Sequence, residues 1–345
     1  MEVMGRGSGG EFYQAVIFTF VYVAFFGNLA ISLLLSAQSL QNIFWDKKGI
    51  CLYTYSAAAA AMLFPLTQLR SLHQVSFAGL GSTIAISVAI GLLMFQCYST
   101  TDSDPSGRHF DMVNTDSTFT EAFSASTAAV FAFGGQGLYL ETMSEMKDAR
   151  KFKKSLFVST FLIMVFYFLS TCSIYFTYGD AVKSNAMFEL PDGAIKRVAS
   201  FAVLIHVLVS YLLANQVICR AIHVRVSPLS VDKGDWLEKL HWLLITTSAL
   251  VLSWAISNAI PFLSNLMGVI ASLTTAPLTF GFPAFFYIVA CKKLKREIGP
   301  LERVALWCMI VVSAILLLAG TFVNVLELKN VWSKVGTPFS CNNLT

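Results

Sequence analysis

Nine long apolar stretches divide the chain, and they constrain its fold more than any other feature. A helix that crosses a bilayer needs about 20 largely apolar residues, because every backbone polar group must be bonded within the helix. Only 13% of the residues are charged, against about 25% in a soluble domain, which excludes an ordinary soluble protein. The stretches run approximately from 12 to 40, 51 to 70, 77 to 98, 119 to 146, 153 to 178, 195 to 219, 236 to 259, 262 to 290 and 302 to 326. The sequence therefore predicts an all-α polytopic membrane protein with about nine transmembrane helices.

The Lys and Arg residues collect in alternate connecting segments, and cytoplasmic loops carry this excess. The basic side holds the N-terminus and the clusters within 147–154, 220–239 and 292–303. This predicts a cytoplasmic N-terminus and, after nine spans, a C-terminus outside the cell or in a lumen. The net charge of +4 is dispersed over short segments, so the expected partner is the lipid bilayer and not nucleic acid.

The seven cysteines form no CxxC pair and no Cys/His ligand spacing. They predict neither a zinc site nor a disulfide framework, since most lie within spans as apolar residues. The sequence contains no P-loop, no GxSxG, no HExxH and no histidine cluster. We therefore expect no catalytic residues, no metal and no cofactor, and a chain that is not an enzyme.

The fourth stretch is interrupted by Gly134, Gly135 and Gly137 within four positions, with Gln136 among them. Each Gly costs about 1 kcal/mol relative to Ala in a helix interior. Broken backbone at membrane depth is tolerated where it is buried in protein or lines a cavity, and transporters use such breaks to bind substrates and ions. The alternative is a packing notch that lets another helix cross closely.

Acidic residues follow the interruption. Glu141 and Glu145 stand at i and i+4 on one helix face, and an acidic residue within a span is by default a functional candidate. Glu145 stands close to Lys147, so a solvated ion pair explains it equally well. Glu141 is the better candidate for a buried carboxylate.

Two other stretches carry unusual residues. The eighth has Pro277 and Pro283, and proline within a helix removes a backbone bond and kinks the helix; the nearby Thr274, Thr275 and Thr279 either satisfy the freed groups or line a polar path. The sixth has His206 and Ser210 on one face. His206 either takes part in proton coupling or bonds to a neighbouring helix.

The segment FAFGGQGLYLETMSEMKDARKFKKS resembles the sixth helix and following loop of the amino acid/auxin permease family of secondary transporters. NLMGVIASLTTAPLTFGFPAFFYI resembles the tenth helix of that family. The resemblance implies a five-plus-five inverted-repeat transporter fold, with the nine spans as helices three to eleven. Residues 1–345 would form a single transmembrane domain: 1–98 is the remnant of the first repeat, 119–293 the complete second repeat and 302–326 the final helix. The stretch before residue 15 resembles the family's approach to helix three, which implies an N-terminal truncation with Met1 internal to a longer protein.

The resemblance also implies site residues. The unwound, substrate-contacting segment of the family corresponds here to Phe133, Gly134, Gly135, Gln136 and Gly137. The family commonly has His where Gln136 stands, and Gln cannot titrate. Candidates for binding a coupling proton or sodium ion are Glu141, which matches an acidic position of the family, His206 and Ser210.

The leading hypothesis is ion-coupled secondary transport of amino acids by alternating access, with the substrate carboxylate held by backbone amides around 134–137 and a proton or sodium ion as partner. The expected location is the plasma membrane or a vacuolar or lysosomal membrane. The second hypothesis is a non-transporting sensor, scaffold or incomplete fragment of such a transporter, motivated by the two missing helices.

Overall fold

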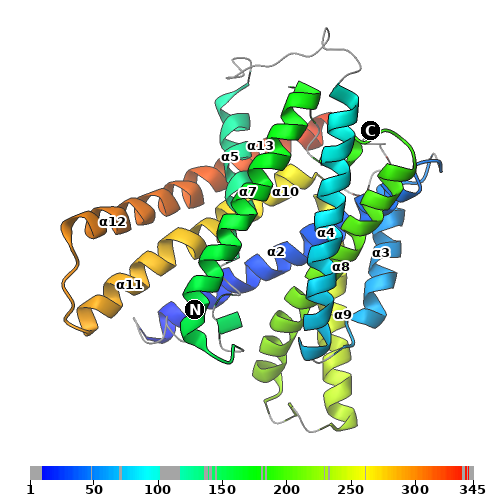
Figure 1. The fold of residues 1–345 in the computed structure, drawn as a ribbon. Helices are drawn as coiled ribbons and strands as arrows, with labels where there is room; N and C mark the ends of the chain where they lie inside the picture. Colours follow the sequence, from blue (N-terminus) through cyan, green and yellow to red (C-terminus); the bar gives the residue numbers. More distant parts are fainter. Residues whose placement is uncertain are drawn as a thin grey trace. The chain divides into compact units, whose positions relative to one another are not determined.

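A computed structural model of the chain shows a helical protein (Figure 1). It describes residues 10–47, 49–69, 72–101, 117–135, 139, 142–143, 146–179, 182, 185–228, 230–231, 234–260, 262–335, 339 and 341. Within these residues all regular structure is helical. The longer helices are α2 (Glu11–Ile43), α3 (Leu52–Leu66), α4 (Leu72–Thr101), α5 (Phe119–Ala132), α7 (Phe152–Tyr178), α8 (Ala194–Val226), α9 (Trp236–Ala259), α10 (Leu263–Ile270), α11 (Phe282–Lys293), α12 (Pro300–Ile315) and α13 (Thr321–Val335).

Every predicted apolar stretch contains a helix, and within the described residues seven helices are long and apolar enough to cross a membrane. The all-α polytopic architecture is therefore confirmed. The stretch predicted over 51–70 holds the shorter α3, of 15 residues. It ends early because Thr67 and Gln68 turn out of the helix: the Thr67 hydroxyl donates to the Phe64 carbonyl at 2.8 Å, and the Gln68 amide donates to the Thr246 hydroxyl on α9 at 3.1 Å.

The chain divides into two compact units that interleave along the sequence. Unit 1 comprises residues 1–27, 116–155 and 264–336, and unit 2 comprises 28–115, 156–263 and 337–345. Helix α2 contributes its first half to unit 1 and its second half to unit 2. Each unit is described below by itself.

Unit 2 is built on the pairing of α4 with α8 (Figure 1). Small side chains let these helices approach closely, with Ala89 of α4 among the buried residues Ala202, Val203 and Val207 of α8. A second apolar cluster joins the end of α2 to α3 and α8 through Ala37, Leu40, Tyr55, Ala59 and Leu204. Small residues at helix contacts are typical of membrane proteins, where close packing rather than the hydrophobic effect holds helices together.

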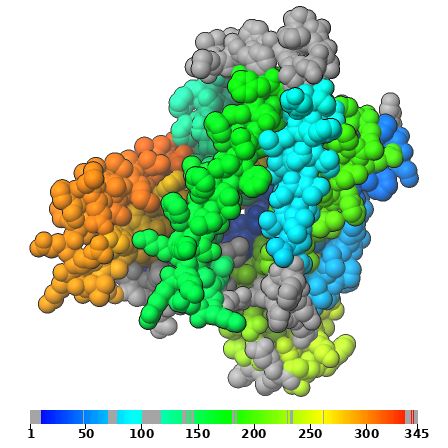
Figure 2. Space-filling model, in the orientation of Figure 1, coloured from blue at the N-terminus to red at the C-terminus, as the bar shows by residue number. Residues whose placement is uncertain are grey.

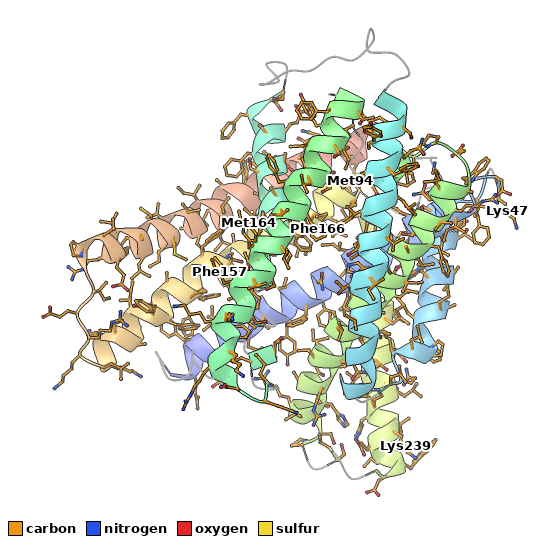
Figure 3. The ribbon with its side chains drawn as sticks, in the orientation of Figure 1. Lys47, Met94, Phe157, Met164, Phe166 and Lys239 are labelled. Carbon is orange, nitrogen blue, oxygen red and sulfur yellow. A yellow bond between two sulfur atoms is a disulfide. The ribbon has the colours of Figure 1, made fainter. Side chains whose placement is uncertain are left out.

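Helix α7 is exposed along most of its length. Phe157, Met164 and Phe166 are 73%, 55% and 45% exposed, and they project from α7 in Figure 3; the space-filling view shows the helix, in green, uncovered on its visible face (Figure 2). Within unit 2, Ile174 and Tyr178 near its C-terminal end pack against a further apolar cluster, formed by Leu93, Cys97, Leu190 and Ala199. An apolar helix with this exposure is suited to contact with lipid.

Unit 1 contains three single turns of π-helix. Two lie between α10 and α11, at Ala271–Thr275 and Pro277–Gly281, and the third lies between α12 and α13, at Leu316–Gly320. The wide π turns carry the chain past Pro277, which has no amide hydrogen to donate. Thr274 donates its hydroxyl to the Ile270 carbonyl at 2.7 Å, so for this residue the structure shows local bonding within its own helix.

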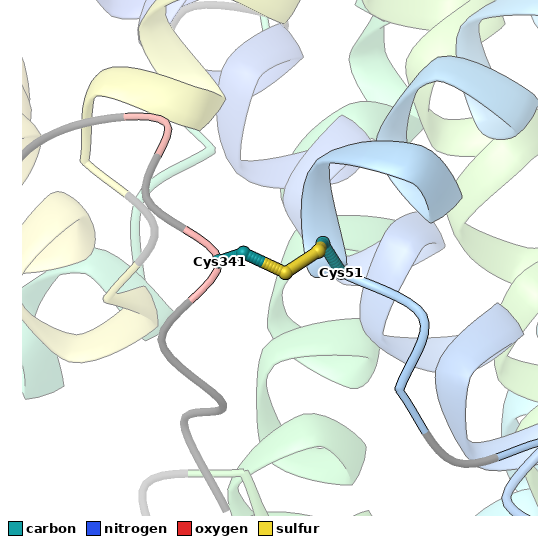
Figure 4. Close-up of a disulfide and its surroundings, with 2 residues drawn as sticks. All are labelled: Cys51 and Cys341. Carbon is teal, nitrogen blue, oxygen red and sulfur yellow. A yellow bond between two sulfur atoms is a disulfide. The ribbon is translucent and has the colours of Figure 1, made fainter.

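A disulfide in unit 2 joins Cys51, just before α3, to Cys341 (Figure 4). Their Cα atoms lie 5.2 Å apart, within the range that a disulfide spans. The expectation that the cysteines form no disulfide is therefore wrong for this pair. Sequence spacing gives no signal, because 290 positions separate the two residues and only the fold brings them together. The other five cysteines take part in no disulfide among the described residues.

Candidate functional site

The candidate site is the end of α5 in unit 1. This helix has only 14 residues and stops at Ala132, well inside the apolar stretch predicted over 119–146. Its start is fixed by a capping box, in which Thr118 accepts from the Glu121 amide and Glu121 accepts from the Thr118 amide. Its end tightens, because the Phe133 and Gly134 amides donate to the Val130 and Phe131 carbonyls at 3.3 and 2.8 Å. Residues 133–135 are not helical.

Gly134 is in close contact with the π turn that precedes Pro277. A Cβ atom added to Gly134 would lie 2.5 Å from Cγ2 of Thr275, which is too close for any real Cβ contact. Gly135 has more room, since its Cβ would lie 3.4 Å from the ring of Tyr139. The close approach at Gly134 is what the packing interpretation of the glycines predicts. The helix also ends beside it, as the interpretation of a broken helix predicts.

The structure gives positions for some of the predicted site residues. Phe133 is half-exposed and Gly134 and Gly135 follow it at the end of α5. Gln136, Gly137 and Glu141 lie outside the described residues. The described part of the site therefore consists of the C-terminal end of α5 and the Thr275 side chain against it.

His206 and Ser210 lie on α8 in unit 2. Nδ1 of His206 lies 2.8 Å from the Ser82 hydroxyl on α4, and the Ser210 hydroxyl donates to the His206 carbonyl at 2.9 Å. The structure thus shows the cross-helix bond that was one of the two interpretations of His206. That bond joins His206 of α8 to Ser82 of α4, and Ser210 bonds the His206 carbonyl within α8. Both residues belong to unit 2, whereas residues 133–135 belong to unit 1.

Sequence reasoning missed Asn324, which bonds α13 to α5. Its Oδ1 accepts from the Ser124 hydroxyl at 2.7 Å, and its Nδ2 donates to the Thr127 hydroxyl at 2.9 Å and to the Gly320 carbonyl at 2.8 Å. Gly268 of α10 packs so closely that an added Cβ would overlap Oδ1 of Asn324. An Asn within a span was the available signal, because polar residues there usually bond across helices.

The end of α5 has a defined chemical character. A helix C-terminus carries a partial negative charge from its last carbonyl groups, and it attracts cations. A free helix end within an apolar stretch is suited to bind a cation, such as an ammonium group or a metal ion. The amides of Phe133 and Gly134 are already used by α5, so an anionic group would have to meet amides further along the chain.

The sequence is similar to those of known membrane transporters. The family model described as transmembrane amino acid transporter protein matches residues 1–326. The N amino acid transport system protein of Neurospora crassa is 24% identical, over 98% of this chain and 74% of its own length. Amino acid transporter AVT3C of Arabidopsis thaliana is 25% identical, over 59% of this chain and 44% of its own length. Auxin transporter-like protein 3 of Medicago truncatula is 24% identical, over 52% of this chain and 38% of its own length.

The family match covers residues 1–326, which is nearly the whole chain. The chain belongs to the family of transmembrane amino acid transporter proteins.

Proposed function

We propose that the chain carries out ion-coupled secondary transport of amino acids by alternating access. The observation that carries this proposal is the end of α5 at Ala132, inside an apolar stretch of a chain that belongs to an amino acid transporter family. Broken helices at membrane depth supply free helix ends for substrates and ions. The names of the relatives, among them an amino acid transport system protein, support an amino acid as the substrate.

The proposed substrate site is Phe133, Gly134, Gly135, Gln136 and Gly137. The ammonium group of the substrate would lie at the negative end of α5. Its carboxylate would meet backbone amides of the same segment beyond Gly134, whose own amide is bonded to Phe131. Glycines leave space beside the backbone, which favours small neutral amino acids.

A coupling ion, proton or sodium, is part of the proposal. Glu141, His206 and Ser210 remain its candidate ligands. The bond of His206 to Ser82 gives the imidazole a defined partner on another helix. A protonated ring would donate from both of its nitrogens.

We propose a cytoplasmic N-terminus and a plasma membrane, vacuolar or lysosomal location. Lys47 and Lys239 lie at opposite ends of unit 2 (Figure 3), as residues on opposite sides of a membrane would. The charge pattern puts Lys239 on the cytoplasmic side. Cys51 stands four positions after Lys47 and forms a disulfide with Cys341. Because disulfides persist in oxidising compartments, this bond supports placing Lys47 on the extracellular or luminal side.

We also propose that the helices follow the five-plus-five inverted-repeat plan, with helices of the first repeat in 1–98, a complete second repeat in 119–293 and a final helix in 302–326. The order of long helices and the broken α5 at the start of the second repeat support this plan.

The test is uptake by proteoliposomes that contain the full chain. We expect a labelled small neutral amino acid to accumulate when a proton or sodium gradient is imposed, and to equilibrate without accumulation when the gradient is collapsed. Gly135→Leu would place a large side chain in the site and abolish uptake at an unchanged protein content. Absence of flux under both gradients would contradict the proposal.

The alternative is a non-transporting sensor or scaffold, for which the exposed apolar length of α7 could contact another membrane protein in place of lipid. The same vesicles separate the two functions. A sensor would bind the labelled amino acid in detergent, with loss of binding in Gly135→Leu, yet show no flux under either gradient.

A further inference from the structure

We infer that Asn324 is a positioning residue for the substrate-binding segment: it fixes the place and rotation of α5 and thereby of residues 133–135. The inference rests on the proposed function for its transport readout only. The hydrogen bonds of Asn324 on which it is based lie entirely within unit 1.

Helix α5 is held in unit 1 by two buried polar residues. In this helix Ser124 and Thr127 are the buried residues, with 9% and 1% of their surface exposed. Both bond to Asn324, which is completely buried. Helix α5 has no fully buried apolar side chain to fix its rotation, so the polar bonds to Asn324 define which face it turns toward α13.

The side-chain amide of Asn324 has a hydrogen-bond partner for its oxygen and for each of its two hydrogens. Its two amide hydrogens go to Thr127 and to the Gly320 carbonyl, and its oxygen receives the Ser124 hydroxyl. The Thr127 hydroxyl in turn donates a hydrogen bond to the Ser124 carbonyl at 2.7 Å. A saturated network of this kind specifies one arrangement, because any rotation of α5 leaves buried polar groups unpaired.

Two glycines, Gly268 and Gly320, pack closely around the bonds of Asn324. Gly268 packs directly on the amide of Asn324, and a Cβ atom added to Gly320 would lie 3.0 Å from Ser272 and 3.3 Å from Thr127. The glycines let α10 and the third π turn close around Asn324. The amide therefore cannot move without displacing backbone.

The network lies close to the site. Phe133 stands six positions after Thr127, which corresponds to about 9 Å along a helix. A helix as short as α5 transmits a rotation or shift at Thr127 directly to its end. Misplacement by about 1 Å is enough to cost a binding site most of its effectiveness.

The experiment uses matched variants of the full chain. Asn324→Leu removes all three bonds, Thr127→Val removes a hydroxyl at constant shape, and Thr127→Ser keeps that hydroxyl. Ser126→Ala is the control on the same helix, because Ser126 is exposed and bonds only its own Ala122 carbonyl. In reconstituted vesicles we expect the KM for the amino acid to rise about tenfold or more in Asn324→Leu and Thr127→Val. Thr127→Ser and Ser126→Ala should retain the KM of the parent.

A spin label gives a readout that does not require transport. Phe133→Cys is labelled in a chain with Cys172 and Cys308 replaced by Ser, and Val311→Cys on α12 is labelled in a second sample as the control site. We expect Thr127→Val and Asn324→Leu to increase label mobility at 133 and leave it unchanged at 311. Thr127→Ser should restore the parent spectrum at 133.

The outcomes separate the two claims. Absence of flux in the parent chain contradicts the proposed function, while the mobility at 133 still decides the positioning role. Unchanged mobility at 133 in both Thr127→Val and Asn324→Leu overturns the inference. If Asn324→Leu loosens both sites, Thr127→Val decides: an effect at 133 alone supports positioning, and an effect at both sites shows a general structural role and overturns it.

Discussion

The Ser82 hydroxyl of α4 lies 2.8 Å from Nδ1 of His206 on α8, in the middle of the helix pair around which unit 2 is built. The same nitrogen lies 3.3 Å from the Ser82 carbonyl. Hydrogen bonds between transmembrane helices contribute about 0.6 kcal/mol on average and up to about 1.7 kcal/mol. His206 is thus part of the contact between α4 and α8.

A double-mutant cycle tests this contact. Ser82→Ala and His206→Phe should each lower the unfolding temperature of the purified protein, and the double variant should lose less than the sum of the two. We expect a coupling free energy of about 0.6 kcal/mol or more. Thr83→Ala is the control, since Thr83 is exposed on α4 and bonds its own helix. Strict additivity would show that the pair does not interact.

The contact of Gly134 with Thr275 makes a second prediction. Gly134→Ala should reduce uptake strongly, because its Cβ would lie 2.5 Å from Cγ2 of Thr275. Gly135→Ala should be tolerated, since the nearest atom to its Cβ lies at 3.4 Å. The two variants remove the same backbone freedom, so the difference between them isolates the steric effect.

The rescue of Gly134→Ala is equally specific. Thr275→Ser removes the methyl group that the new Cβ would meet and keeps the hydroxyl, whose oxygen lies 3.6 Å away. Uptake by the double variant should exceed that of Gly134→Ala alone. Equal uptake by the two would show that Thr275 does not impose the requirement for glycine.

The disulfide makes a prediction about orientation. In sealed vesicles of known sidedness, a thiol reagent that does not cross membranes should label Cys51 and Cys341 only after reduction, and only from the extracellular or luminal side. A chain with both residues replaced by Ser is the control for labelling of other cysteines. Labelling from the cytoplasmic side alone would reverse the proposed topology.

Two neighbouring basic residues at the start of α8 differ in burial, and this difference predicts unequal effects on stability. Lys196 has a side chain only 9% exposed and pairs with Asp192 at 2.8 Å, whereas Arg197 and Asp46 are both about half exposed and pair at 3.4 Å. Asp192→Ala leaves a buried ammonium without its partner and should cost about 1–3 kcal/mol of unfolding free energy. Asp46→Ala should cost less than about 1 kcal/mol. Thermal unfolding of the purified variants measures both, and equal losses would contradict the argument.

The sequence predicted the helices well because the need to satisfy the backbone in lipid is local. Each apolar stretch must form a helix whatever its neighbours are, and the break after Ala132 follows from the adjacent glycines. The end of α3 at Leu66 was not predicted, since it depends on the bond of Gln68 to Thr246 of another helix.

The features that depend on distant partners were missed for the same reason. Asn324 bonds Ser124 across 200 positions of sequence, and hydropathy does not indicate which polar residue of one span meets which residue of another. Likewise the close packing of Gly134 depends on Thr275. The sequence did not distinguish this threonine from its two neighbours in the same stretch, Thr274 and Thr279. Pairings of this kind are set by helix packing and not by local composition.

The bond between Cys51 and Cys341 converts most of the polypeptide into a closed ring. Of the long helices described, only α2 lies outside it. A single cut in any connecting segment of the ring, such as the polar one between α4 and α5, opens the ring without producing two molecules. On electrophoresis such a nicked protein would run as one covalent chain until a reductant is added, and the helices on either side of the cut would stay joined in the membrane.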